Sequence, residues 1–146
     1  PVLGTNPTEK LLTNGIRGSL KYSDFEWCSW TNNDSVSFTI DLLKPEVLNT
    51  LTLGCITNNG MAIHKPASVK VEVSDDNSNF REAAMQSFTP EEIFREGNFI
   101  ENLPLKLGGT QGRYVRVSAK GPGVCPASHV RSGQASRIFF DEVMLE

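Results

Sequence analysis

Histidines, cysteines and paired acids are the residues of this 146-residue chain that could do chemistry. His64 lies in "MAIHKP", and His129 follows Cys125 in "GVCPASH". Cys with His can act as nucleophile and base, and both are zinc ligands. Here they are scattered, without zinc-ligand spacing, and Cys125 precedes Pro126 rather than a helix start that would lower its thiol pKa. We therefore expect neither a zinc site nor a thiol nucleophile.

The cysteine count is odd, at three, so the chain cannot pair all of its thiols internally. Three cysteines are too few for a disulfide scaffold. Cys28, Cys55 and Cys125 are therefore expected to be small buried apolar residues. A Cys55–Cys125 bridge stays open as an alternative.

Paired carboxylates could hydrolyse a glycosidic bond. Asp75 and Asp76 lie in "VSDDNSNF", which reads as a solvated turn after a strand. Asp141 and Glu142 lie inside an expected strand, where neighbouring side chains point to opposite faces and cannot meet at one bond. Nucleophile elbows, phosphate loops and dinucleotide fingerprints are also missing from the sequence. We expect that this domain is not an enzyme.

Composition indicates a globular domain, with 38% hydrophobic and 21% charged residues. We expect residues 1–146 to form one domain. The net charge of −3 offers no electrostatic reason to bind nucleic acid or an anionic membrane, and no apolar run has the length of a membrane span. Because the chain begins with Pro1 rather than Met, we expect it to be a piece of a longer protein.

Strict alternation of apolar and polar residues predicts strands with one core face and one wet face. It is clearest in "VSFTIDL", "VKVEVS" and "RYVRVSA", and weaker β-rich runs are "VLNTLTLGCI", "NFIENLPLKL" and "RIFFDEVML". Only "TPEEIFREG" reads as a helical turn. Short strands separated by Gly, Asn, Asp, Ser and Pro predict an all-β sandwich or barrel.

Two long loops, roughly residues 57–66 and 120–136, are rich in hydrogen-bonding groups, and such loops commonly carry binding sites. Lys65 and Arg131 within them are expected to be surface charges. Sugar sites combine an aromatic face with polar groups. Trp27 and Trp30 lie three residues apart in "FEWCSWTNND". We expect Trp27 in the core and Trp30 to be exposed, because polar residues follow it.

The order of motifs resembles the discoidin-like domain, also called the coagulation factor 5/8 type C domain. The resemblance runs over nearly the whole chain and is most specific in "KPASVKVEVSDDNSNF" and "RYVRVSAKGPGVCP". It extends to the family-32 carbohydrate-binding modules and to the module at the C-terminus of Bacteroides-type family 20 glycoside hydrolases (chitobiase, β-N-acetylhexosaminidase). It implies a jelly-roll β-sandwich of about eight antiparallel strands.

The resemblance also implies that the chain is a C-terminal fragment of a larger glycoside hydrolase. It would be a non-catalytic module of that exported enzyme, in the periplasm or at the surface of a bacterium. The expected partners are a glycan of the N-acetylglucosamine or galactose type and the catalytic domain of the same chain. For the sugar site we expect Trp30, Asn58, Asn59, His64 and His129. The alternative is a structural accessory domain that docks on the catalytic domain and binds no sugar.

A structural Ca²⁺ is a further implication of the resemblance, with Asn14, Ser19 and Glu142 at the matching positions. Asn14 replaces the usual Asp, and a neutral amide is the weaker ligand for a hard cation. The alternative is that Asn14 and Gly15 form only a tight turn. Two further departures are Ser128 and Arg137, where aromatic residues would be expected. They favour altered sugar specificity or the docking role.

Overall fold

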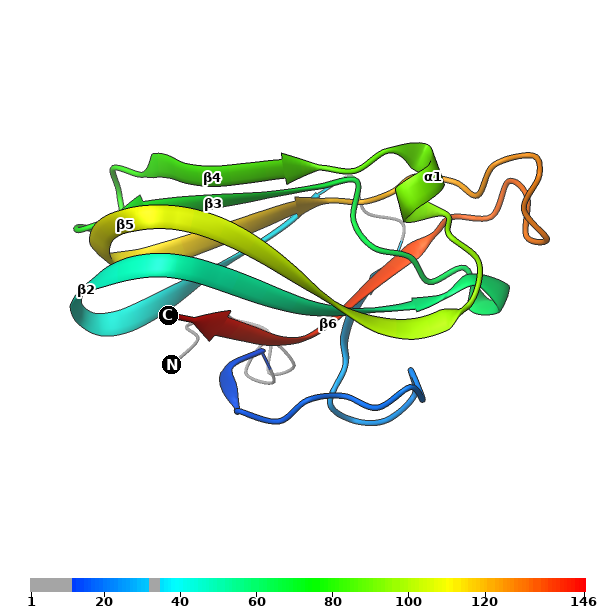
Figure 1. The fold of residues 1–146 in the computed structure, drawn as a ribbon, viewed down its shortest axis with the longest axis horizontal. Coiled ribbons are helices and arrows are strands. Elements are labelled where there is room, and N and C mark those ends of the chain that lie inside the picture. The colour runs from blue at the N-terminus through cyan, green and yellow to red at the C-terminus, as the bar shows by residue number, and fades with distance from the viewer. Residues whose placement is uncertain (1–11, 32–34) are drawn as a thin grey trace.

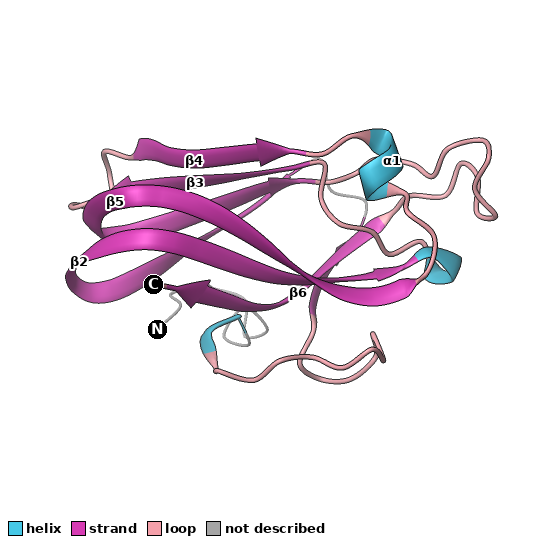
Figure 2. Ribbon diagram, in the orientation of Figure 1, coloured by secondary structure: helices cyan, strands magenta, loops and turns pink. Residues whose placement is uncertain are grey.

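The protein is mostly β-structure in the computed structural model, which describes residues 12–31 and 35–146 (Figures 1 and 2). The elements are β1 (Cys28–Thr31), β2 (Ser35–Asn58), the 3-10 helix η2 (Asn59–Met61), β3 (Ser68–Ser74), β4 (Arg81–Ser87), α1 (Pro90–Ile93), β5 (Asn98–Lys120) and β6 (Arg137–Leu145). The predicted all-β sandwich is confirmed.

The strands pair antiparallel in the order β1-β6-β2-β5-β3-β4. β2 and β5 are long and pair from Ser35 with Lys120 to Asn58 with Asn98. Both turn back at one end of the molecule (Figure 1), near register shifts between Asp41 and Thr50. Six strands are described rather than about eight, because "VSFTIDL" and "VLNTLTLGCI" are halves of β2, and "NFIENLPLKL" and "RYVRVSA" are halves of β5.

The predicted core faces are confirmed. Val69, Val71 and Val73 of β3 are fully buried, as are Val115 and Val117 of the neighbouring β5. They join one large core cluster with residues of β2 and β6. Burial of a Val side chain stabilises the fold by roughly 1.5 kcal/mol or more, so this cluster makes the sandwich a rigid support for its loops.

The predicted helical turn is α1. The Thr89 hydroxyl caps it by accepting the Glu92 N–H, and Pro90 occupies its first turn. Ile93 is buried and anchors the turn to the sandwich. The turn sets the course of the next residues, Phe94 to Glu96, toward the end of the sandwich where the long loops lie (Figure 1). Within residues 12–31 and 35–146, no helix is long and apolar enough to cross a bilayer.

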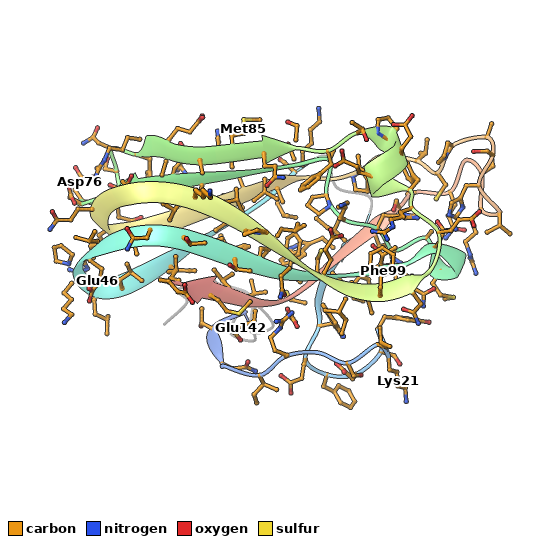
Figure 3. The ribbon with its side chains drawn as sticks, viewed as in Figure 1. Lys21, Glu46, Asp76, Met85, Phe99 and Glu142 are labelled. Atoms are coloured by element: carbon orange, nitrogen blue, oxygen red, sulfur yellow. The ribbon has the colours of Figure 1, made fainter. Side chains whose placement is uncertain are left out.

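A β-bulge in β6 overturns the prediction that Asp141 and Glu142 point to opposite faces. Leu53 pairs with Val143 but Cys55 pairs with Phe140, so β6 carries one extra residue opposite Gly54. Both carboxylates therefore reach the segment before β1. Figure 3 shows Glu142 beside that segment.

The two carboxylates clamp this N-terminal segment. Asp141 Oδ2 accepts the Arg17 Nε–H at 2.7 Å and the Gly18 N–H at 2.9 Å, and Glu142 Oε2 accepts the Gly15 N–H at 2.9 Å. Burial raises the pKa of Glu142, with a further contribution from the Asp141 charge. These carboxylates hold the chain in place and do not form an open acid–base pair. Trp27 is buried, as predicted, beneath the same segment.

All three cysteines are buried, which confirms that prediction. Cys55 and Cys125 are free thiols, so the alternative bridge between them is absent. Burial raises the pKa of Cys55 to about 12, with the Glu101 carboxylate adding to the effect, and burial also raises the pKa of Cys125. Neither thiol is activated as a nucleophile.

Candidate functional site

The two long loops meet at one end of the sandwich, beside α1 (Figure 1). The Arg131 Nε–H donates to the Gly60 carbonyl oxygen at 2.5 Å, and its Nη1 donates to Gln134 at 3.2 Å. The His64 N–H donates to the Arg137 carbonyl at 3.0 Å. Arg131 is therefore a link between the loops rather than a plain surface charge.

Lys65 also differs from expectation, since it is buried and its Nζ lies 3.2 Å from the Glu101 carboxylate.

The second loop, residues 121–136, is closed by its own backbone. The Cys125 N–H donates to Gln134 O at 2.8 Å, and the Gly133 N–H donates back to Cys125 O at 3.0 Å. The Ser136 N–H donates to Gly123 O at 2.9 Å. These bonds preform the loop, so a ligand would not have to order it on binding.

A hydrogen-bond network joins the loops through one amide oxygen. Asn59 Oδ1 lies 2.9 Å from His64 Nε2 and 2.8 Å from His129 Nε2. The far nitrogen of each ring is also engaged. His64 Nδ1 lies 2.6 Å from Ser136 Oγ, and His129 Nδ1 accepts the Arg131 N–H at 2.8 Å.

This network has one consistent proton arrangement. His129 Nδ1 accepts a hydrogen bond, so neutral His129 must carry its proton on Nε2 and donate it to Asn59 Oδ1. Because that oxygen is an acceptor, His64 Nε2 must also donate to it. His64 Nδ1 then receives the Ser136 hydroxyl proton, whose other acceptor, the Ala62 carbonyl, lies farther away at 3.2 Å.

Electrostatics agree with a neutral His64. Burial, with a smaller contribution from the neighbouring His129, lowers its pKa to about 4. The two rings lie edge to face with centroids 5.2 Å apart, and Phe94 packs edge-on against His64 at 4.9 Å. Burial disfavours the charged imidazolium form of His64, so its ring stays uncharged at neutral pH.

A pocket of about 320 Å³ opens in front of this network. Its lining combines apolar surface, a carboxylate, an amide, a hydroxyl and an imidazole: Asn59, Phe94, Glu96, Pro126, Ser128, His129 and Val130. An aromatic side chain with a few converging polar groups suits a sugar, which has apolar ring carbons and polar hydroxyls.

Of the five predicted sugar-site residues, two line the pocket and three do not. Asn59 and His129 line the pocket, and His64 lies behind them with 0% exposure, so it supports the site and cannot touch a ligand. Asn58 contributes a backbone pair with Ile63, at 2.9 and 3.1 Å, and does not line the pocket. Trp30 is half-buried on β1 with its ring 5.5 Å from Phe140, so the expected exposure is wrong and the residue belongs to the core.

Phe94, Glu96 and Ser128 are pocket residues that the sequence reading missed. Phe94 supplies the aromatic group that position 128 lacks, from a different element. The sequence could have indicated Phe94, because it lies at the end of the helical turn predicted from "TPEEIFREG", where the Thr89 cap fixes the start of the turn. Arg137, the other departure, lies 5.8 Å from the Tyr22 ring and 5.5 Å from the Phe139 ring and donates to Met61 O.

The three candidate calcium ligands have protein partners. Asn14 Oδ1 accepts the Ile16 N–H at 2.9 Å, and Glu142 Oε2 accepts the Gly15 N–H. Ser19 Oγ donates to Asp24 at 2.6 Å. Within the described part of the chain, no cluster of three His, Cys, Asp or Glu could hold a metal. Calcium stays a prediction from the resemblance.

Comparison with solved structures supports the fold. The module CpGH89CBM32-6 of Clostridium perfringens has a TM-score of 0.59 at 16% identity, over 100% of this chain and 90% of that one. The C-terminal domain of a chitobiase from Bacteroides fragilis has a TM-score of 0.54 at 15% identity, over 94% and 78%. A fucose-binding module of Streptococcus pneumoniae, SpX-3, has a TM-score of 0.53 at 16% identity, over 100% and 90%.

Sequence comparison identifies the family. No curated protein matches the sequence. The profile described as F5/8 type C domain matches residues 3–132, which is most of the chain. With its β-sandwich and its similarity in fold to carbohydrate-binding modules, this chain belongs to the F5/8 type C (discoidin-like) domain family.

Proposed function

We propose that this domain is a non-catalytic carbohydrate-binding module of an exported bacterial glycoside hydrolase. The observation that carries the proposal is the preformed pocket, with the Phe94 ring and the polar groups of Asn59, Glu96 and His129 on its walls. Its small size predicts weak binding to one or two sugar units, because little area is buried. The parent enzyme that we infer is a β-N-acetylhexosaminidase (chitobiase), and the glycan is of the N-acetylglucosamine or galactose type.

Affinity electrophoresis and calorimetry against glycans ending in N-acetylglucosamine or galactose test this proposal. We expect millimolar to micromolar binding that falls at least tenfold in Phe94→Ala and in His129→Ala, a loss of about 1.4 kcal/mol or more. Phe25→Ala is the matched control, because Phe25 is 92% exposed and does not line the pocket. Retention on no glycan, or an equal loss in the Phe25 control, would contradict the proposal.

A second candidate is docking on a neighbouring domain of the same protein. It is favoured by Ile16, Leu20 and Phe25, which are 51%, 52% and 92% exposed on the N-terminal segment. Exposed apolar side chains gathered on one segment are typical of contact surfaces. The two roles use different surfaces, so substitution of Phe25 would weaken docking and leave sugar binding unchanged.

A further inference from the structure

The Asn59 amide has a defined orientation, which decides what the pocket offers a ligand. Its oxygen receives two N–H donors, from His64 and His129. The NH₂ group is therefore the part of the amide left for other partners. Across residues 12–31 and 35–146 Asn59 Nδ2 donates to no protein acceptor, and Asn59 lines the pocket.

The opposite orientation is excluded by proton count. If the NH₂ group faced the histidines, His129 would accept hydrogen bonds at Nε2 and, from the Arg131 N–H, at Nδ1. A ring that accepts at both nitrogens carries no proton and would be an imidazolate, which does not form near neutral pH. His129 therefore fixes the orientation of the Asn59 amide. The buried His64, which is itself held by Ser136, adds a second donor to the same oxygen.

We propose that the two histidines lock Asn59 as a hydrogen-bond donor, so that the pocket selects a sugar bearing an N-acetylated amine over one bearing a free amine. This proposal rests on the proposed function. An acetamido carbonyl accepts from Asn59 Nδ2, whereas an ammonium group can only donate and would face another donor. The acetamido N–H has an acceptor in Glu96, and its methyl group has apolar surface in Pro126 and Val130.

The Glu96 carboxylate favours the other ligand, the sugar with a free amine. This exposed carboxylate would attract an ammonium group, but in high dielectric an exposed ion pair contributes little. The Asn59 donor lies deeper, next to the buried His64, where an unmet or opposed hydrogen bond costs more. We therefore expect the amide orientation to outweigh the Glu96 charge.

Calorimetry with methyl glycosides of N-acetylglucosamine and of glucosamine, at neutral to slightly acidic pH, tests the inference. We expect the wild-type domain to prefer the acetamido sugar by about tenfold. Asn59→Asp keeps an oxygen for both histidines but replaces the donor with an acceptor, so the preference should disappear or reverse. Equal binding of both sugars by the wild type, tighter binding of glucosamine, or an unchanged preference in Asn59→Asp would overturn the inference.

Two His64 variants separate positioning from stability. His64→Gln retains an N–H donor toward Asn59 and should keep the preference, whereas His64→Leu removes that donor and should reduce the preference about threefold. If both variants behave alike at matched folded fraction, measured by thermal unfolding, His64 is not a positioning residue. Failure of the wild type to bind any glycan would instead contradict the proposed function itself, so the two failures can be told apart.

Discussion

At the scale of single residues, hydrogen bonds within the protein can occupy every polar atom of a side chain, which is then unavailable to a ligand. His64 is the clearest case, because its neutral ring is fully buried and bonded at both nitrogens. The pattern "MAIHKP" offered a polar loop histidine for the sugar. The residue holds Asn59 through its Nε2–H, and only the neutral ring can also accept the Ser136 hydroxyl proton at Nδ1.

Acid should therefore destabilise the domain through His64. Its pKa falls from 6.5 in the unfolded chain to about 4 in the fold. The stability linked to it is fully present above pH 6.5 and is lost as the pH falls through that value toward 4. Between pH 7 and pH 5 we expect a loss of roughly 1–2 kcal/mol in the free energy of unfolding, which His64→Gln should not show. Urea unfolding of both proteins at the two pH values measures this.

The comparison with His64→Gln cancels the contributions of all other titratable groups, because both proteins contain the same ones. If the two proteins lost the same stability between pH 7 and pH 5, the assignment to His64 would be wrong.

At the level of elements, the bulge in β6 decides how the N-terminal segment is attached. The extra residue opposite Gly54 brings the Asp141 side chain to the β2 backbone. Arg17 lies there too, because its Nε–H donates to the Asp141 carboxylate. A Cβ on Gly54 would lie 1.9 Å from Asp141 Oδ1 and 2.7 Å from Arg17 Nη2. Glycine is therefore required there by close approach of the bulged strand.

Gly54→Ala should cost about 2–3 kcal/mol of stability, because the clamp must move and leave a buried carboxylate displaced. Gly60→Ala is the control, since its nearest neighbour would be Asn58 Oδ1 at 3.8 Å and its backbone needs no positive φ. That control should stay within about 0.5 kcal/mol of wild type. Thermal and urea unfolding report both changes, and equal effects of the two substitutions would refute the close-approach argument.

For the whole molecule, the sandwich acts as a stiff body that presents the pocket beside His129 at one end. A single weak site suits a domain that is joined to another, because linkage replaces intrinsic affinity by effective concentration. The segment that carries the exposed apolar residues runs along a different side of the sandwich from α1 and the 121–136 loop (Figure 1), so docking and sugar binding can coexist.

A tandem of two copies joined by a flexible linker should bind a polymeric glycan about a hundredfold more tightly than one copy, with monosaccharide affinity per site unchanged. In the matched control, the second copy carries Phe94→Ala and His129→Ala and should add nothing. A tandem no tighter than the single domain on the polymer would speak against a role in glycan targeting.

The sequence by itself was sufficient for the architecture, because period-two patterning and turn residues report burial locally. Val36, Phe38 and Ile40 are buried as the alternation of "VSFTIDL" predicts, and the helical turn after Thr89 is in place. The two loops that carry the site were also identifiable from their length and polarity.

Only the tertiary structure decided which residues form the site. Phe94 and His129 are 35 positions apart in sequence and meet because α1 and the 121–136 loop end at the same edge of the sandwich. Trp30 became a core residue because edge strand β1 pairs with β6 and carries its ring onto Phe140. The bulge likewise brought Asp141 and Glu142 to the same segment of the chain rather than to opposite faces. Local patterns describe one strand at a time, whereas sites and bulges arise from the register between strands.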